Sequence, residues 1–166
     1  MGTSHVLLFD SNIIIEAVRT GIWKAITGRE RVVTVDTCEN ELLRGDESGA
    51  GYVTVTPEDL ARAVVETLPP LASAEFRLRY PNADGMDAGE RDLFALTLTR
   101  GDDFRVCSCD KAAVRAAHAL GWIDRVVSLE SLAAAVGARP HPPLWIQFTE
   151  ARLSEWRTKL QLGVSI

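Results

Sequence analysis

The stretch His5-Val6-Leu7-Leu8-Phe9-Asp10 joins a short apolar run directly to an acid. An apolar run of this length is typical of a strand that is buried inside a sheet. The segment Asn12 to Ile26, which follows, spaces its apolar residues as an amphipathic helix does. This part of the chain therefore predicts a buried strand, an acid at its carboxyl end, and a helix.

The rest of the chain repeats this alternation of short apolar runs and amphipathic segments. Further strands are predicted over Arg31 to Val35, Tyr52 to Val55, Phe104 to Ser108 and Arg125 to Val127. Further helices are predicted over Thr37 to Leu43, Thr56 to about Thr67, Leu71 to Arg79, Asp87 to Arg100, Asp110 to Leu120, Ser128 to Gly137 and Ile146 to Leu160. Such alternation favours an α/β fold of three layers, αβα, around a central, mainly parallel sheet of about four or five strands.

Two parts of the 166-residue chain are expected to differ in their roles. Residues 1–137 carry the alternating pattern and have the length of one domain. Residues 138–166 begin with a proline-rich connector and end in a helix. The apolar residues Leu153, Trp156 and Leu160 of this helix are spaced to pack on the domain or on a partner.

Composition narrows the expected location and partners of the protein. The sequence has no run of about 18 apolar residues, so we expect no membrane span. The apolar run before Asp10 follows no Lys or Arg and is too short for a signal peptide, which predicts a cytoplasmic protein. The net charge of −5 is unusual for a protein that binds nucleic acid, unless a cation offsets the acids or basic residues gather near the site.

Four acids are expected to gather at one edge of the sheet. Asp10 directly follows the first strand, and Asp110 follows the strand from Phe104 to Ser108. Glu41 belongs to the helix after the second strand, and Glu90 to the helix that precedes the Asp110 strand. Ligands bind outside the carboxyl ends of the strands in parallel sheets, so this edge is the expected site.

The chemistry of such a group follows from its charge. Gathered carboxylates repel one another unless a cation lies among them. Mg²⁺ and Mn²⁺ prefer oxygen ligands of this kind, together with water and substrate phosphate. A cation held in this way activates water and stabilises the charge that develops on a phosphodiester. The sequence contains no Walker loop, histidine-rich metal motif or Gly-x-Ser-x-Gly elbow, so the carboxylates are the source of chemistry that it offers.

Four segments of the chain, taken in order, resemble the motifs of PIN domains, a family of metal-dependent ribonucleases. These segments are Leu8 to Asn12, Thr37 to Leu42, Asp87 to Leu96, and Val106 to Lys111 followed by Ala116 to Gly121. The resemblance covers Val6 to Val136 and implies a PIN-like fold. Many small members of this family are the toxin half of a toxin–antitoxin pair, which suggests the same role for this chain.

The resemblance also implies a role for each residue of the site. It implies hydrolysis of RNA with Mg²⁺ or Mn²⁺ bound by Asp10, Glu90 and Asp110. Glu41 would contribute directly or through a water molecule. Lys111, next to the fourth acid, is expected to contact substrate phosphate. The implied partners are an RNA substrate, an antitoxin protein and a second copy in a homodimer. Supporting side chains are expected at Ser11, Asn12, Asp87 and Ser108.

Each acid also has a simpler structural explanation. Asp10 and Asp110 are both placed to cap the helix that follows them. Asp87 is expected to cap the next helix, and Glu90 could complete a capping box with it. We favour Asp87 as the cap and Glu90 as a metal ligand, because four acids at one predicted edge are harder to explain as four separate caps.

Two other functions stay open at the level of sequence. A phosphatase with Asp10 as its nucleophile would resemble haloacid dehalogenases, but those enzymes carry a second Asp where this chain has Asn12. A PIN-like module without activity would serve as a binding partner, although all four acids are present. Within the nuclease hypothesis, Glu41 is preferred to Glu39 as the second acid.

Overall fold

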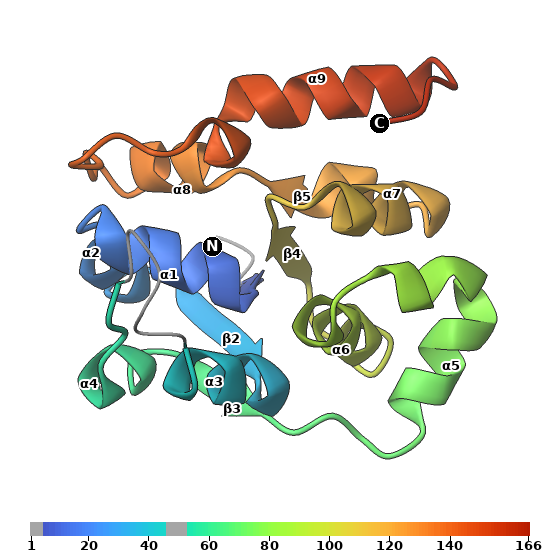
Figure 1. The fold of residues 1–166 in the computed structure, drawn as a ribbon, viewed down its shortest axis with the longest axis horizontal. Coiled ribbons are helices and arrows are strands. Elements are labelled where there is room, and N and C mark those ends of the chain that lie inside the picture. Colours follow the sequence, from blue (N-terminus) through green and yellow to red (C-terminus); the bar gives the residue numbers. More distant parts are fainter. Residues whose placement is uncertain (1–4, 46–52) are drawn as a thin grey trace.

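A parallel β-sheet forms the centre of the computed structural model, which describes residues 5–45 and 53–166 (Figure 1). The strands within these residues are β1 Val6–Phe9, β2 Arg31–Val35, β3 Val64–Glu66, β4 Phe104–Cys107 and β5 Val126–Val127. Their order across the sheet is β3-β2-β1-β4-β5, and every neighbouring pair is parallel. The predicted α/β fold with a central parallel sheet is therefore confirmed.

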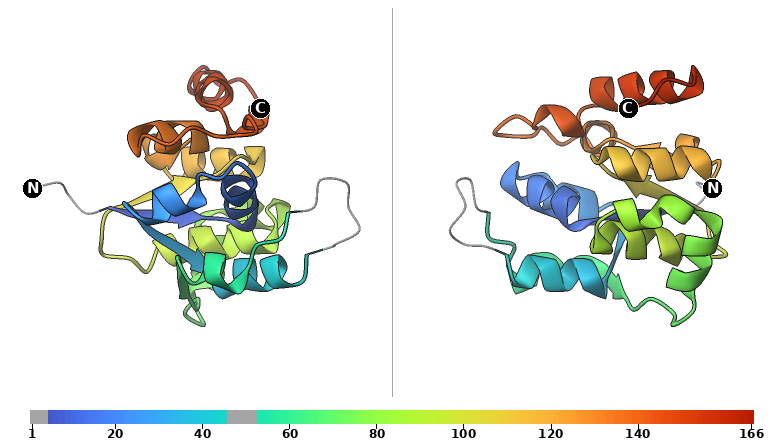
Figure 2. Two further views of the ribbon diagram at one scale, coloured as in Figure 1. Left: turned by 90° about the vertical axis from the view of Figure 1, so that its left-hand side faces the viewer. Right: turned by 45° about the vertical axis from the view of Figure 1, so that its right-hand side comes forward.

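Helices connect the strands and flank the sheet, which gives the predicted αβα layers (Figure 2). The α-helices of the described residues are α1 Ser11–Arg19, α2 Trp23–Thr27, α3 Asp36–Leu43, α4 Pro57–Leu60, α5 Ala72–Arg79, α6 Ala88–Thr97, α7 Lys111–Ala119, α8 Leu129–Ala135 and α9 Glu150–Gln161. Short 3-10 helices in the same residues are η1 Pro81–Gly85, η2 Ile123–Arg125 and η3 Ile146–Phe148.

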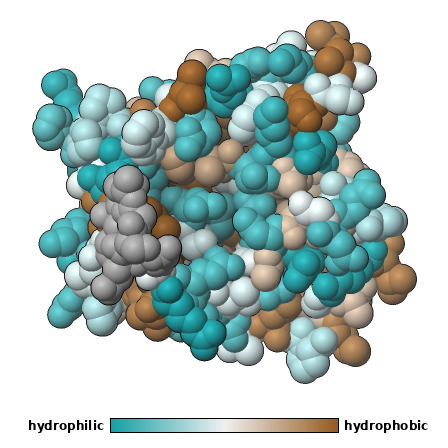
Figure 3. Space-filling view, in the orientation of Figure 1, coloured by the Kyte–Doolittle hydropathy of each residue, from teal (hydrophilic) through white to brown (hydrophobic). Residues whose placement is uncertain are grey.

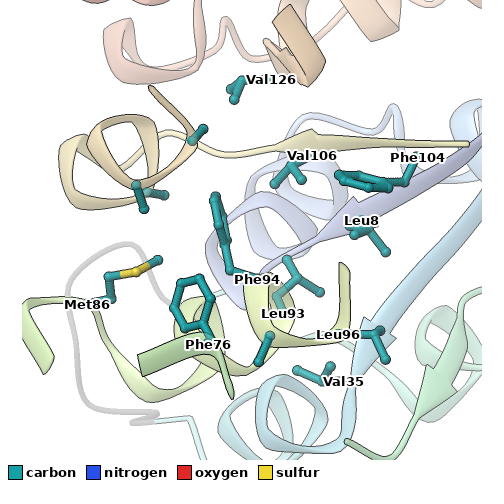
Figure 4. Close-up of a cluster of buried hydrophobic side chains, with 14 of the residues drawn as sticks. Leu8, Val35, Phe76, Met86, Leu93, Phe94, Leu96, Phe104, Val106 and Val126 are labelled. Carbon is teal, nitrogen blue, oxygen red and sulfur yellow. The ribbon is translucent and has the colours of Figure 1, made fainter. Parts of the chain in front are cut away.

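Successive residues of the central strand pack into two separate hydrophobic cores. Val6 and Leu8 of β1 belong to the first core, and Leu7 and Phe9 belong to the second. The first core also contains side chains from α5, α6, α7 and α9, among them Phe94 (Figure 4). The second core contains side chains from α1, α2 and α8. Burial on both faces explains why β1 is apolar at every position.

The third strand lies further along the chain than the sequence predicted. Val53 to Val55 forms no strand, and Tyr52 lies outside the described residues. The predicted helix from Thr56 to about Thr67 begins as expected, with a capping box at Thr56. The prediction is wrong beyond the first turn, because this helix, α4, already ends at Leu60. The chain then forms β3, which pairs with β2. Its two valines are β-branched, and such side chains favour the pleated surface of a sheet over a helix.

Three other helices differ from their predicted bounds. The segment predicted as one helix from Asn12 to Ile26 is divided into α1 and α2 by Gly21, whose φ of 72° is a conformation that glycine adopts readily. α6 ends at Thr97, before the predicted end at Arg100. The last helix begins after Thr149, whose side chain accepts a hydrogen bond from the first turn of α9, so the residues from Ile146 form η3 instead.

The C-terminal segment packs on the rest of the protein. α9 contacts α7 and α8 (Figure 1), and its Leu153 and Trp156 are buried in the first core. In the connector before it, the backbone N–H of Trp145 donates a hydrogen bond to the buried carboxylate of Glu16 on α1, at 2.9 Å. Arg19 donates two hydrogen bonds of 2.7 Å to the same carboxylate. The connector and α9 are thus both attached to the αβα layers.

The surface that Figure 3 shows is mainly hydrophilic, with hydrophobic residues scattered over it. None of the described helices combines the length and the apolar character that a membrane crossing requires. Large hydrophobic side chains are exposed at Leu43, Val64, Leu71, Leu78, Trp145, Ile146, Leu162 and Val164. Exposed apolar residues at scattered positions are ordinary on a folded protein.

Candidate active site

The carboxyl ends of β1 and β4 lie side by side at the centre of the sheet. The two strands are paired along their whole length, so that Phe9 lies opposite Cys107. Asp10 follows β1 at once, and Ser108 and Asp110 follow β4. The topology therefore brings two of the predicted acids to the same edge, where ligands of parallel sheets bind.

Asp10 uses its two carboxylate oxygens in different ways. It is buried, and its Oδ1 accepts a hydrogen bond of 2.8 Å from the backbone N–H of Ile13, which caps α1. Its Oδ2 accepts the hydroxyl of Ser108 at 3.5 Å. The two explanations for Asp10, as a helix cap and as a site residue, are therefore compatible.

Glu90 lies beside Asp10, although the two residues come from different elements. Glu90 is buried in the first turn of α6, and its carboxyl group lies close enough to that of Asp10 for each to shift the pKa of the other. The hydroxyl of Ser108 lies 3.4 Å from Glu90 Oε1 and accepts the backbone N–H of Asp110 at 3.3 Å. Ser108 is thus in contact with three of the residues at this edge.

Burial raises the pKa values of both Asp10 and Glu90. Loss of solvation is the largest cause for each, and the negative charges of Asp87 and Asp110 raise both pKa values further. The hydrogen bond from Ile13 opposes this effect at Asp10. Among the described residues, no Lys, Arg or His forms an ion pair with either acid. The ionised forms are therefore costly without another source of positive charge.

Asp110 and Glu41 approach the same edge from two further helices. Asp110 is half-buried and caps α7, because its Oδ1 accepts the backbone N–H of Ala112 at 2.6 Å. Glu41 on α3 is exposed, and its Oε2 accepts the hydroxyl of Ser11 at 2.6 Å. Ser11 therefore holds one carboxylate oxygen of Glu41.

Gly89 allows α6 to approach α3 at the position of Glu41. A Cβ atom at residue 89 would lie 2.9 Å from Glu41 Oε2 and 2.8 Å from Cys38 Sγ, closer than a side chain tolerates. Sequence reasoning assigned this glycine no role. A glycine inside a helix costs about 1 kcal/mol relative to alanine, so its presence in α6 was a signal of close packing.

Asp87 differs from its predicted role as a capping side chain. It occupies the N-cap position of α6, but its side chain makes no capping hydrogen bond and no capping box forms. A capping box would need the Glu90 carboxyl group to reach back to the N-cap, but its Oε1 lies inward, 3.4 Å from the hydroxyl of Ser108. Desolvation and the charges of Glu41 and Asp110 raise the pKa of Asp87. We define the acid group as Asp10, Glu41, Asp87, Glu90 and Asp110.

Three other residues considered for the site do not belong to the acid group. Asn12 and Lys111 are exposed at the starts of α1 and α7. Glu39 lines a separate, mainly apolar hollow between α3, α4 and β3. Glu41, the preferred second acid, is therefore the one of the two glutamates that faces Ser11 and α6.

The oxygen donors of the acid group match those that a hard divalent cation prefers. Within the described residues, no three His, Cys, Asp or Glu side chains stand in a metal-binding arrangement. Burial is the main cause that raises the pKa values of the Cys38, Cys107 and Cys109 thiols. The carboxylates fit a cation through their chemistry, and the buried pair also lacks the counter-charge that a cation would provide.

Comparisons with protein-family models, with curated proteins and with solved structures found no match to this chain. The folded chain brings Asp10, Glu90 and Asp110 together around Ser108, and it places Glu41 next to the start of α6.

Proposed function

We propose that the protein is a metal-dependent endoribonuclease of the PIN type, which hydrolyses phosphodiester bonds in RNA. The observation that carries the proposal is the burial of two carboxyl groups, Asp10 and Glu90, at the carboxyl edge of the sheet, where the hydroxyl of Ser108 lies 3.5 Å from one and 3.4 Å from the other. Capping α1 explains Asp10 alone, and it does not explain why a second acid is buried against it. Buried acids with raised pKa values are costly for stability, and they are common at sites that bind or react.

The chain would hold Mg²⁺ or Mn²⁺ with Asp10, Glu90 and Asp110. Glu41 would contribute directly or through water. When bound, the cation supplies activation of water and stabilisation of charge on the phosphodiester. The chain itself holds the acids in place: Ser108 contacts Asp10 and Glu90, and the caps on α1 and α7 fix the orientation of two carboxylates.

The finer parts of the proposal rest on the resemblance to PIN domains. They are the choice of RNA as the substrate, a cytoplasmic location, the role of toxin with an antitoxin partner, and pairing with a second copy. These parts follow from the four ordered segments rather than from the geometry of the acid group. Of these parts, hydrolysis of RNA can be measured with the purified protein alone, without a partner.

Cleavage of end-labelled single-stranded RNA tests the proposed function. Wild-type protein is expected to cleave the RNA with Mg²⁺ or Mn²⁺ and to stop cleaving in EDTA. Asp10→Asn is expected to slow cleavage by about 100-fold or more, because loss of a charged ligand removes several kcal/mol of transition-state stabilisation. The amide still has an oxygen with which to cap α1, so the fold should be kept.

The matched control is Asp59→Asn, which changes a capping aspartate of α4, before β3 and away from the carboxyl edge. This variant should cleave as the wild type does. Cleavage that is insensitive to EDTA, or equal in wild type and Asp10→Asn, would overturn the proposal. If the protein binds Mn²⁺ but cleaves no RNA, RNA hydrolysis is not its function, and the acid group is a metal-binding site only.

A further inference from the structure

Two arginines from neighbouring helices meet over one exposed aspartate. Arg77 on α5 has its Nε 3.1 Å from Asp84 Oδ1 in η1, and Arg91 on α6 has its Nη1 3.9 Å from the same oxygen. The Asp84 side chain is 77% exposed, so water screens both contacts. Two positive charges therefore share one weakly held negative charge; we call Arg77 and Arg91 the arginine pair.

Arg91 is incompletely bonded in this arrangement. Its distance of 3.9 Å from Asp84 is longer than a hydrogen bond. Among the described residues, Asp84 is the one acid that forms an ion pair with Arg91. Its buried Nε has no hydrogen-bond partner among those residues. Arg77 is better satisfied, because its Nη1 also donates to Ser73 Oγ at 2.6 Å. The Nη groups of Arg91 make no hydrogen bond with the described residues, and its side chain is 21% exposed, so these groups are available to an anion.

Arg91, one member of the arginine pair, lies one helical turn from Asp87 of the acid group. Arg91 and Asp87 are four residues apart on α6, and residues at this spacing share a helix face about one turn, 5.4 Å, apart. The positive charge of Arg91 acts on Asp87 and opposes the other effects that raise its pKa. A ligand that reaches the acid group along this face of α6 therefore meets Arg91 next.

We propose that the arginine pair binds a backbone phosphate of an RNA strand, next to the phosphate that the acid group cleaves. This inference rests on the proposed function for the identity of the strand. Guanidinium groups bind phosphate through paired, charge-assisted hydrogen bonds. The phosphate would replace the carboxylate of Asp84, and little is lost because an exposed ion pair contributes about 1 kcal/mol or less. The pair would thus draw a polyanion to a protein of net charge −5.

Binding without cleavage tests this inference. Fluorescence anisotropy of a fluorescein-labelled, random-sequence single-stranded RNA is measured in EDTA over a series of salt concentrations. Arg77→Ala and Arg91→Ala should each weaken binding several-fold and reduce the slope of log Kd against log salt by about 0.7, the value for one lost phosphate contact on a single strand. Asp84→Asn should tighten binding, because it removes the competing carboxylate.

Arg29→Ala provides the matched control, because Arg29 is an exposed arginine just before β2, at the opposite edge of the sheet. It should leave the affinity and the salt slope at wild-type values. Asp84→Asn changes an exposed side chain, so this variant should fold. Its result therefore tests the inference even if an arginine variant does not fold.

The outcomes separate this inference from the proposed function. If wild-type protein cleaves RNA but all three variants bind RNA as it does, the arginine pair is not a phosphate site and the nuclease proposal stands. If wild-type protein binds no RNA, the inference is overturned. If the variants shift binding as expected but the wild type cleaves no RNA with metal present, the phosphate site stands without the nuclease.

Discussion

Asp10 combines a structural and a chemical role within one carboxylate. Its Oδ1 caps α1, while its Oδ2 accepts the hydroxyl of Ser108, which also lies 3.4 Å from Glu90 Oε1. The sequence predicted Asp10 at this edge because it directly follows a strand, and Glu90 because it begins the helix that precedes the Asp110 strand. It did not show that both groups lie within reach of the Ser108 hydroxyl, because this depends on how closely α6 approaches the ends of β1 and β4.

Substitutions at Asp10 should separate these two roles in the metal-free protein. Asp10→Ala removes the cap on α1 and should lower the free energy of unfolding by about 1 kcal/mol, offset in part by loss of a buried charge. Asp10→Asn keeps a capping oxygen and removes the charge, so it should be at least as stable as wild type. Urea denaturation in EDTA near neutral pH measures both. An Asp10→Asn protein that is less stable than Asp10→Ala would contradict the assigned cap.

The stability of the metal-free protein should fall as pH rises. The pKa values of Asp10 and Glu90 are raised in the folded state, whereas in the unfolded chain such groups titrate near about 4. Between these values the folded protein binds more protons, so the free energy of unfolding falls with rising pH and levels off above the raised pKa values.

Glu90→Gln isolates this effect from the other titrating groups. The variant has no carboxyl group at position 90, so its stability should fall less steeply with pH than that of wild type. Urea denaturation in EDTA from acidic to alkaline pH gives both curves. Parallel curves would show that burial of Glu90 does not govern the pH dependence.

At the scale of elements, Gly89 sets the distance between α3 and α6. A Cβ atom there would crowd Glu41 Oε2 and Cys38 Sγ, so Gly89→Ala should reduce the free energy of unfolding by about 1–3 kcal/mol, the usual cost of overpacking. It should also slow RNA cleavage by displacing Glu41. Gly101→Ala is the control, because a Cβ at residue 101 meets no atom within 4 Å. If both variants unfold at the same urea concentration, the close approach is not required.

The strands were predictable where a short run is mainly apolar or β-branched. β1, β2, β4 and β5 lie where the apolar runs predicted them, because these strands need little more than burial to form. β3 was missed, since Val64 and Val65 follow a strong helix start at Thr56 with no turn signal of their own. Pairing with β2 decides their conformation, and local sequence does not report a partner that lies about 30 residues away.

The acid group was predictable in part for a related reason. Acids that directly follow strands are placed by topology alone, which is why Asp10 and Asp110 were found. The capping side chain predicted at Asp87 was wrong, because the residue stands at the N-cap of α6 but its side chain makes no capping hydrogen bond. Arg91 was missed because its relation to Asp84 arises from the packing of α5, α6 and η1 rather than from a motif.

At the scale of the whole molecule, the C-terminal segment is attached through a buried ion pair. Arg19 binds the buried Glu16, donates to the carbonyl of Pro143 at 2.8 Å and lies 5.1 Å from the ring of Trp145. Arg19→Ala would leave the Glu16 charge buried without its partner, so we expect a loss of about 3 kcal/mol in the free energy of unfolding.

Urea denaturation compares this variant with Arg139→Ala, which changes an exposed arginine of the same connector. The Arg139→Ala protein should unfold as the wild type does. Equal stability of all three proteins would mean that the ion pair does not hold the connector to α1.

Calorimetric titration with Mn²⁺ tests the central claim, that the buried acids form a metal site, most directly. We expect wild-type protein near neutral pH to bind Mn²⁺ and to release protons, seen as a dependence of the binding heat on the buffer, because metal ligands must be deprotonated. Glu90→Gln should bind at least about 10-fold more weakly, since it lacks one carboxylate ligand. A folded wild-type protein that binds no Mn²⁺, or a Glu90→Gln protein that binds it equally well, would contradict the claim.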